Sequence, residues 1–333
     1  MNFVNLKKQW ISYEFHHSFA KELNLDLSAY YVDLSYQTPG GLTKAQFLAN
    51  PRQARPAAGL FKSAEQQGAT FKIKSTGLSA RASQVINNRW AWDLSQALQV
   101  NNIENPTIRN YEIRHEPNYS TRGVLHRKGK LQSDLGFEYQ AGQLNSSTYG
   151  NSLGVKGPLQ LTQNTNVQQG SLFLQNEYVG LHQWIFTFSG SLNSYWTEYI
   201  GNEAIFSPRF AILRKLGDHQ SIVAKVAHGF SPPSISELRP SSGEINRTLK
   251  AEKGWNHEIT YRGKYQKFNW DLSIYQFNLD ETIVVRRAAD GSDFFTNAGS
   301  TTQQGLELSS TWMISPTLSL EQSHTWQNFR FAN

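Results

Sequence analysis

The feature of this sequence that most restricts its fold is a strict alternation of apolar and polar residues over long segments. In 131–142 the odd positions include Leu131, Leu135, Phe137 and Tyr139, whereas every even position is Gln, Asp, Glu or Gly. Successive side chains of a β-strand point to opposite faces, so this period of two predicts strands with one apolar and one wet face. Comparable alternation predicts about fourteen strands, at 9–19, 23–36, 70–86, 90–100, 119–128, 131–142, 167–179, 184–196, 205–216, 219–230, 254–265, 268–281, 303–313 and 317–329.

The lengths of these strands and of their connections indicate a membrane-spanning sheet. Strands of soluble proteins average about 5–6 residues, whereas a tilted strand crosses a bilayer with about 9–11. Short turns are predicted near 21–22, 87–88, 128–130, 180–181, 216–218, 266–267 and 315–316, and long loops near 37–69, 102–118, 144–166, 198–204, 231–253 and 282–302. This sorting predicts an all-β fold, a transmembrane antiparallel up-and-down β-barrel with short periplasmic turns and longer extracellular loops.

Composition supports the same fold class. Aromatic residues make up 13% of the chain and charged residues only 17%, below the roughly 25% of a typical soluble domain. The sequence contains no run of 18 apolar residues and therefore predicts no transmembrane helix. A β-barrel remains possible, because it crosses the membrane with short alternating strands. The recurrence of large aromatic residues towards strand ends suggests interfacial girdles, with core packing of a soluble β protein as the alternative; these residues are Trp10, Trp90, Trp184, Trp196, Tyr199, Trp255, Trp312 and Trp326.

The charge and the missing cysteines limit the partners and the chemistry. The chain has no cysteine, which removes disulfides, thiolate metal sites and Cys nucleophiles. A net charge of +6 favours anionic partners such as nucleic acid, lipopolysaccharide or an acidic ligand. Because the basic residues are spread over many strands without a recognisable module, we expect no nucleic-acid partner. Residues 1–15 lack the apolar core of a signal peptide.

No pattern in the sequence predicts catalysis. His16 and His17 are neighbours on a predicted strand and point to opposite faces, so they cannot chelate one metal by themselves. No nucleophile elbow, P-loop or HExxH helix is present. Four carboxylates could line a wet lumen or pair in a hydrolase, and the lumen is favoured; they are Glu258, Asp271, Glu307 and Glu321. We therefore expect no enzyme, no catalytic residue, no bound metal and no cofactor.

Two local patterns call for an explanation. In 37–69, Thr43 is expected to cap a helix at 44–49, and the loop carries Lys44, Arg52, Arg55 and Lys62 against Glu65. This surplus fits capture of an anionic ligand, contact with an acidic outer leaflet, or simple solvation. Second, 23–34 and 268–279 share Asn, Asp, Leu, Ser, Tyr and Leu in register. The apolar parity of both changes near the middle, either because the strand leaves the lipid band or through convergent composition.

The stretch 228–263 contains a recognisable constellation of residues, namely Gly229, Phe230, Pro232, Pro233, Ser234, Glu237, Leu238, Asn246, Leu249, Glu252, Trp255 and Glu258. It resembles a signature region of TonB-dependent outer-membrane receptors, with Ala251 where that family usually has Pro. Residues 297–310 resemble a second motif, Asn…Gly…Gly-hydrophobic-Glu. Residues 36–59 are similar to an extracellular loop of ferric-siderophore and ferric-citrate receptors.

The resemblance implies a 22-stranded barrel filled by an N-terminal plug, with ligand bound at the extracellular mouth and transport energised by TonB. It implies that residues 1–333 are a fragment of the β-barrel domain, without plug, TonB box or signal peptide and lacking both ends. TonB would then act through the missing N-terminal region.

We therefore expect a receptor for a ferric siderophore or similar chelate in the outer membrane of a Gram-negative bacterium, in contact with lipid and lipopolysaccharide. A passive porin or adhesin-like barrel is the alternative, and a soluble β-sandwich or propeller hydrolase is a third possibility. Loop position alone selects the candidate ligand-binding residues, which are Arg52, Arg55, Tyr199, Arg239, Trp255, Arg286 and Arg287.

Overall fold

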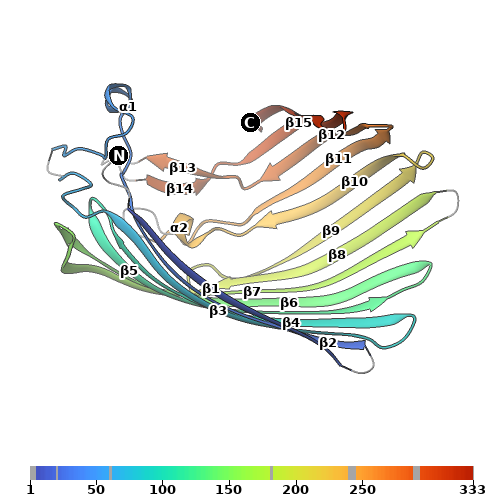
Figure 1. Cartoon of the computed structure of the whole chain (residues 1–333), viewed down its shortest axis with the longest axis horizontal. Helices are drawn as coiled ribbons and strands as arrows, with labels where there is room; N and C mark the ends of the chain where they lie inside the picture. Colours follow the sequence, from blue (N-terminus) through green and yellow to red (C-terminus); the bar gives the residue numbers. More distant parts are fainter. Residues whose placement is uncertain are drawn as a thin grey trace. The chain divides into compact units, whose positions relative to one another are not determined.

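The structure, a computed structural model, describes residues 5–19, 22–59, 62–180, 183–238, 245–287 and 293–332. Fourteen strands form one sheet in which sequential strands are neighbours, in the order β1 to β12, then β15 and β16, and Figure 1 follows them in chain order from blue to red. Their bounds are β1 Leu6–Phe19, β2 Leu23–Gln37, β3 Thr70–Val85, β4 Trp90–Pro106, β5 Asn110–Arg127, β6 Leu131–Ser152, β7 Val155–Val179, β8 Trp184–Thr197, β9 Gly201–Lys215, β10 Gln220–Ser231, β11 Glu252–Tyr265, β12 Phe268–Asp280, β15 Ser300–Ser315 and β16 Leu318–Ala332. The predicted antiparallel up-and-down sheet is confirmed.

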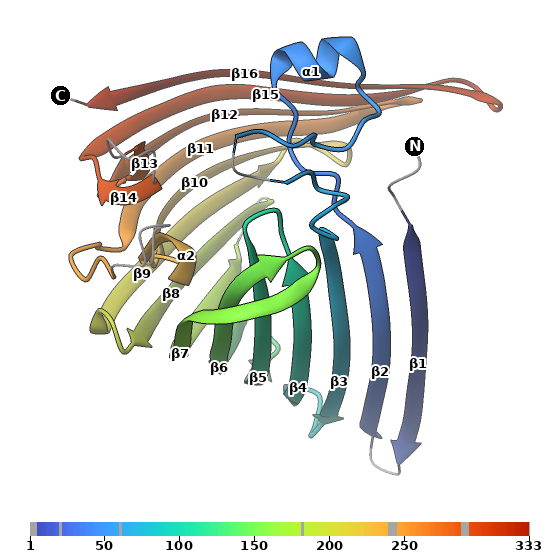
Figure 2. The ribbon, with the colours of Figure 1, turned by 90° about the vertical axis from the view of Figure 1, so that its left-hand side faces the viewer.

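The remaining elements lie in the connections at one end of the strands. Helix α1 (Lys44–Ala49) follows β2, α2 (Ile235–Leu238) follows β10, and β13 (Ile283–Arg287) with β14 (Asp293–Asn297) forms a hairpin between β12 and β15. In Figure 2, α1 lies at the loop end of β2 and β3. Neither α1 nor α2 has the length and apolar character needed to cross a membrane.

The chain divides into two compact units. Unit 1 comprises residues 1–86, 92–123 and 138–169, and unit 2 comprises 87–91, 124–137 and 170–333. Unit 1 therefore holds β1 to β3 with the loop-side parts of β4 to β7, and unit 2 holds β8 to β16 with the turn-side parts of β4 to β7.

Each unit has one apolar and one polar face. In unit 2, Phe188 lies opposite Phe210 in the β8–β9 ladder, and these rings are 52% and 43% exposed. The other face carries the ion pair of Lys225 with Glu258, at 2.8 Å. The division into one apolar and one polar face predicted from alternation is thus confirmed there.

The ladders of unit 1 repeat this division. Leu78 lies opposite Ala29 on the apolar face, whereas Asp26 lies opposite Arg81 on the polar face. The position of Trp10 differs from the prediction, which placed it in an aromatic girdle facing the membrane interface. Its register partner is Val32, and it shares a face with His16, so Trp10 lies on the polar face.

The apolar face is largely uncovered. The accessible surface of the chain is 21152 Å², whereas a soluble monomer of 37.8 kDa is expected to expose about 14,000 Å². Half of the buried hydrophobic residues lie in the connections, where Ala64, Leu238 and Ala251 are at most 1% exposed. Lipid would stabilise such a face, since covering one large apolar side chain contributes about 1.5–3 kcal/mol.

Three predicted long loops are wrong. The segments 102–118, 144–166 and 198–204 are mostly strand, because β6 has 22 residues, β7 has 25 and each pair of strands is joined by a tight turn. Leu153 and Gly154 form the β6–β7 turn with φ values of 56° and 84°, as a two-residue hairpin turn requires. Both faces of these extensions are rich in Ser, Thr, Asn and Gln, so the apolar alternation that marks the other strands is absent.

The other two tight turns share a sequence signal. The hydroxyl of Thr107 accepts hydrogen bonds from the N–H groups of Arg109 and Asn110, both at 3.1 Å. The hydroxyl of Thr197 accepts from the N–H groups of Tyr199 and Ile200, at 3.1 and 3.3 Å. A threonine that caps its own turn in this way was the local evidence against a long loop.

Candidate ligand-binding loops

The connection 38–69 of unit 1 is an ordered element built on α1. The hydroxyl of Thr43 accepts from the N–H of Gln46 at 3.3 Å, and the Gln46 side chain accepts from the N–H of Thr43 at 3.0 Å. This reciprocal capping box confirms the predicted helix. The charged residues Lys44, Arg52 and Lys62 are exposed around it.

Arg55 is held within this connection by its backbone. Its N–H donates to the carbonyl of Pro39 at 2.8 Å, and its carbonyl accepts from the N–H of Ala64 at 3.0 Å. The Arg55 side chain packs beside Gly40, where an added Cβ would lie 3.1 Å from the Cβ of Arg55 and the φ of 76° favours glycine. Arg55 is therefore half-buried and anchored, whereas Arg52 lies exposed in the turn after α1.

Gln67 and Asn151 tie this connection to two neighbouring turns of unit 1. The Gln67 amide donates to the carbonyls of Ile108 (3.2 Å) and Asn151 (3.4 Å), and its oxygen accepts from the N–H of Leu153 (3.0 Å). The Asn151 amide donates to the carbonyls of Gln67 (2.8 Å) and Thr107 (2.6 Å). One pair of amides thus joins 38–69, the β4–β5 turn and the β6–β7 turn.

In unit 2, α2 is attached to the end of β8. Ser234 and Glu237 form a second capping box, with the Ser234 N–H donating to the Glu237 carboxylate at 2.7 Å and the Glu237 N–H to the Ser234 hydroxyl at 3.3 Å. Leu238 is fully buried. The Tyr195 hydroxyl donates to the carbonyl of Pro233 at 3.2 Å. These contacts give several residues of the 228–263 motif a structural role in fixing the loop.

Two asparagines link the loop after α2 to the β13–β14 hairpin. The Asn297 amide oxygen accepts from the N–H of Lys250 at 3.0 Å, and its NH₂ group donates to the carbonyls of Lys250 (3.1 Å) and Glu281 (2.6 Å). The Asn246 amide donates to the carbonyl of Phe295 at 2.9 Å. Figure 1 shows α2 beside this hairpin.

The predicted site residues lie in different surroundings. Arg286 and Arg287 are exposed on β13, and Arg287 pairs with Asp293 at 3.1 Å. Tyr199 lies in the β8–β9 turn. Trp255 lies in β11, within the predicted strand 254–265 rather than in a loop, on the face of Ile259, where its ring contacts His228 at 5.1 Å between centroids. Arg239 lies outside the described residues.

Burial and neighbouring charges shift the pKa of groups at the loop end. Burial, followed by the charge of Glu237, raises the pKa of Tyr195. Burial also disfavours ionised Glu104, but hydrogen bonds from Tyr111 and Lys72, with the charges of Lys72 and Lys74, outweigh it and hold its pKa below the usual range. Glu104 therefore stays ionised and neutralises Lys72, 3.2 Å away, so Lys72 adds little to the basic surplus.

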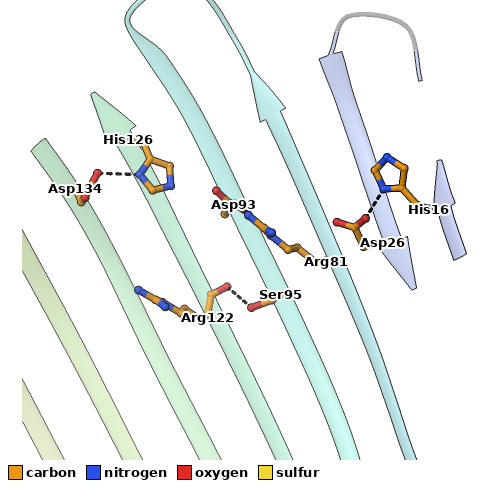
Figure 3. A network of polar contacts seen from close by, with 8 residues as sticks. All are labelled: His16, Asp26, Arg81, Asp93, Ser95, Arg122, His126 and Asp134. Atoms are coloured by element: carbon orange, nitrogen blue, oxygen red, sulfur yellow. Dashed lines mark hydrogen bonds and ion pairs between the residues drawn. The ribbon is translucent and has the colours of Figure 1, made fainter. Parts of the chain in front are cut away.

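Several charged residues on the polar face form ion pairs. Figure 3 shows His16 with Asp26 and Arg81 with Asp93 on neighbouring strands of unit 1. In unit 2, Asp271 pairs with Arg262 at 3.2 Å. Among the described residues no group of three or more His, Asp or Glu side chains could hold a metal ion. Two of the four carboxylates singled out in the sequence, Glu258 and Asp271, thus have cationic partners.

The residues that assemble the loops were not predicted from the sequence. Gln67, Asn151 and Tyr195 carried no motif, and their partners are distant in sequence. Asn246 and Asn297 lay inside recognised motifs, but nothing local indicated that they bind each other's segments. The sequence signal available for this contact was the two glycines themselves. Gly68 and Gly154 both have positive φ values and pack against each other.

An up-and-down antiparallel sheet with one apolar face, one polar face and anchored loops at one end has the architecture of outer-membrane β-barrels. The family described as TonB dependent receptor-like, beta-barrel matches residues 7–332. The chain therefore belongs to this family.

Solved structures share the fold at low sequence identity. The siderophore receptor PiuA from Acinetobacter baumannii matches with a TM-score of 0.76 and 13% identity, over 98% of this chain and 57% of that one. The alcaligin outer-membrane receptor FauA from Bordetella pertussis gives 0.69 and 11%, over 98% and 53%. The copper transporter OprC gives 0.73 and 12%, over 97% and 53%. The chain thus spans about half the length of these proteins.

Proposed function

We propose that this chain is part of an outer-membrane receptor that binds an iron chelate at its loops and transports it with energy supplied through TonB. Family membership supports receptor transport, and siderophore receptors such as PiuA and FauA support a ferric chelate. OprC shares the fold and carries copper, so the choice of cargo depends on the loops of this chain.

The observation that carries the proposal is the basic surplus on the anchored connection 38–69. This segment has four basic residues, Lys44, Arg52, Arg55 and Lys62, and only one acidic residue, Glu65. Ferric siderophores and ferric citrate commonly bear negative charge, and guanidinium groups bind carboxylates by charge-assisted hydrogen bonds. Such contacts strengthen where water is partly excluded.

The remaining candidate residues follow from this site. Arg286 and Arg287 on the β13–β14 hairpin, with Tyr199, would add positive charge and an aromatic surface at the loop end of unit 2, and Arg239 stays a candidate from the sequence alone. Trp255 is a weaker candidate because it lies on the apolar face. The apolar face itself would contact lipid, with lipopolysaccharide at its loop end, in the outer membrane of a Gram-negative bacterium.

The first test is ligand binding. Detergent-solubilised protein would be titrated with ferric citrate and with a neutral ferric trihydroxamate, using quenching of tryptophan fluorescence. Replacing both Arg52 and Arg55 by Ala should raise the Kd for the anionic chelate at least tenfold, since a hydrogen bond to a charged group contributes about 1.5–3 kcal/mol. Lys128→Ala with Lys130→Ala, at the opposite end of the strands, serves as the matched control.

The second test is transport. Uptake of radiolabelled iron chelate by cells that produce the protein should saturate and should stop when TonB is deleted. Unsaturable uptake that persists without TonB would instead indicate the passive porin. An unchanged Kd in the double arginine variant would remove the site assignment while leaving the family intact.

A further inference from the structure

Backbone hydrogen bonds, together with the peptide bonds between them, link Gln67 to Arg55 in the connection 38–69. The N–H of Gln67 donates to the carbonyl of Ser63, and the N–H of Ala69 donates to the carbonyl of Ala64, both at 3.0 Å. The N–H of Ala64 in turn donates to the carbonyl of Arg55 at 3.0 Å. A contact that holds Gln67 in place therefore also restrains the backbone of Arg55.

Gln67 is fixed from outside its own segment. Its side chain is 8% exposed and contacts the β4–β5 turn through Ile108 and the β6–β7 turn through Asn151 and Leu153. Asn151 returns a hydrogen bond to the Gln67 carbonyl at 2.8 Å. Gln67 is buried and Asn151 is half-buried. Removing one of the two side chains therefore leaves polar groups of the other without partners, which destabilises more than the loss of an exposed hydrogen bond.

The backbone beside Gln67 tolerates only glycine. Gly68 has a φ of 57°, and a Cβ built on it would lie 3.2 Å from the Cα of Gly154. Gly154, with a φ of 84°, also donates its N–H to the Asn151 side chain at 2.8 Å. The β6–β7 turn and the 63–69 segment are therefore in backbone contact at this point.

We infer that Gln67 is a positioning residue: together with Asn151 it converts three separate loops into one rigid rim and sets the guanidinium of Arg55 for an anionic chelate. The ligand part of this inference rests on the proposed function, whereas the rigidity part does not. Arg55 is then presented in one orientation before the ligand arrives, which reduces the ordering cost of binding. The described parts of the connection, 38–59 and 62–69, then form a fixed wall of the site.

Three variants test this inference. Gln67→Ala removes every side-chain contact, and Gln67→Glu keeps the acceptor for Leu153 but places a carboxylate against two carbonyl oxygens. Asn151→Asp removes the donors to Gln67 and Thr107 from the other side, in case the Gln67 variants fold poorly. Gln66→Ala is the matched control, because Gln66 is exposed and its side chain accepts only from the nearby N–H of Ser63.

Amide hydrogen exchange in the detergent-solubilised protein gives the first readout. We expect the Arg55 and Ala64 amides to exchange at least tenfold faster in the Gln67 and Asn151 variants and at the native rate in Gln66→Ala. Native exchange at Arg55 in all Gln67 and Asn151 variants would overturn the inference without reference to any ligand.

A double-mutant cycle with ferric citrate gives the second readout. If Gln67 acts through Arg55, Gln67→Ala and Arg55→Ala should each raise the Kd about tenfold, and the double variant should raise it little further, because coupled residues are non-additive. Fully additive losses would contradict positioning. If Arg55→Ala leaves the Kd unchanged while exchange at Arg55 still accelerates in Gln67→Ala, the proposed ligand contact fails and the rigid rim stands.

Discussion

Tyr30 of β2 lies directly opposite Gly77 of β3, and its ring covers the glycine backbone. Tyr275 of β12 has the same relationship to Gly305 of β15. These two tyrosines occupy matching places in the segments 23–34 and 268–279, whose similarity the sequence analysis noted. In both segments the aromatic ring at the point where apolar parity changes lies on the polar face and shields a glycine on the next strand.

The first prediction concerns this pair. Gly77→Ala places a methyl group inside the space of the Tyr30 ring, and overpacking of this kind costs about 1–3 kcal/mol. We expect a lower unfolding free energy in detergent, measured by urea titration. Gly229→Ala should change little, since no atom lies within 4 Å of a Cβ built there. Combining Gly77→Ala with Tyr30→Ala should recover part of the loss, and no recovery would show that the ring is not the cause.

The second prediction tests which face contacts lipid. Phe188→Lys places a charge on the apolar face opposite Phe210 and should cost about 2–4 kcal/mol if this site lies near the bilayer midplane. Folding into lipid vesicles, followed by urea titration, measures that cost. The adjacent Thr187→Lys points to the polar face, opposite Ala211, and should be nearly neutral. Equal costs for the two variants would contradict the assignment of the faces.

The third prediction concerns the Asn297 link in unit 2. Asn297→Ala removes two hydrogen bonds to Lys250 in the 245–251 segment and one to the carbonyl of Glu281, just before β13, each contributing about 0.5–1.5 kcal/mol. The hairpin should then open more often, and trypsin should cleave after Arg286 or Arg287 about tenfold faster. Asn269→Ala, at the turn end of β12, should leave the rate unchanged. Native cleavage kinetics in Asn297→Ala would mean that other contacts hold the hairpin.

The fourth prediction concerns alkaline pH. The pKa of Tyr195 is raised above its ordinary value of 10.0 by burial and by Glu237, so the folded state holds this proton more tightly than the unfolded state. The contribution of its hydrogen bond with Pro233 to the unfolding free energy should therefore be complete below about pH 10. That contribution should be lost as the pH rises through the pKa of the folded state. Absorbance titration of the phenolate, with Tyr195→Phe as the reference, should show one tyrosine that ionises late. A normal titration of Tyr195 would contradict its burial.

Prediction from sequence succeeded where one face of a strand is apolar. Alternation predicts the strands around Leu135, Phe188 and Ile274, because lipid selects apolar side chains at every second position. It failed for 102–118, 144–166 and 198–204, where both faces are polar and only backbone pairing defines the strand. The Thr43 helix was predictable because its capping box lies within four residues.

Alternation and strand length were enough to specify the architecture, since each depends only on neighbours along the chain and on the thickness of the bilayer. The loop rim was decided by folding, because Gln67 and Asn151 lie 84 residues apart and carry no local mark of their partnership. The same holds for Asn297, which binds Lys250 across 47 residues. Buried amides need partners, and only the folded chain determines which carbonyls come within reach.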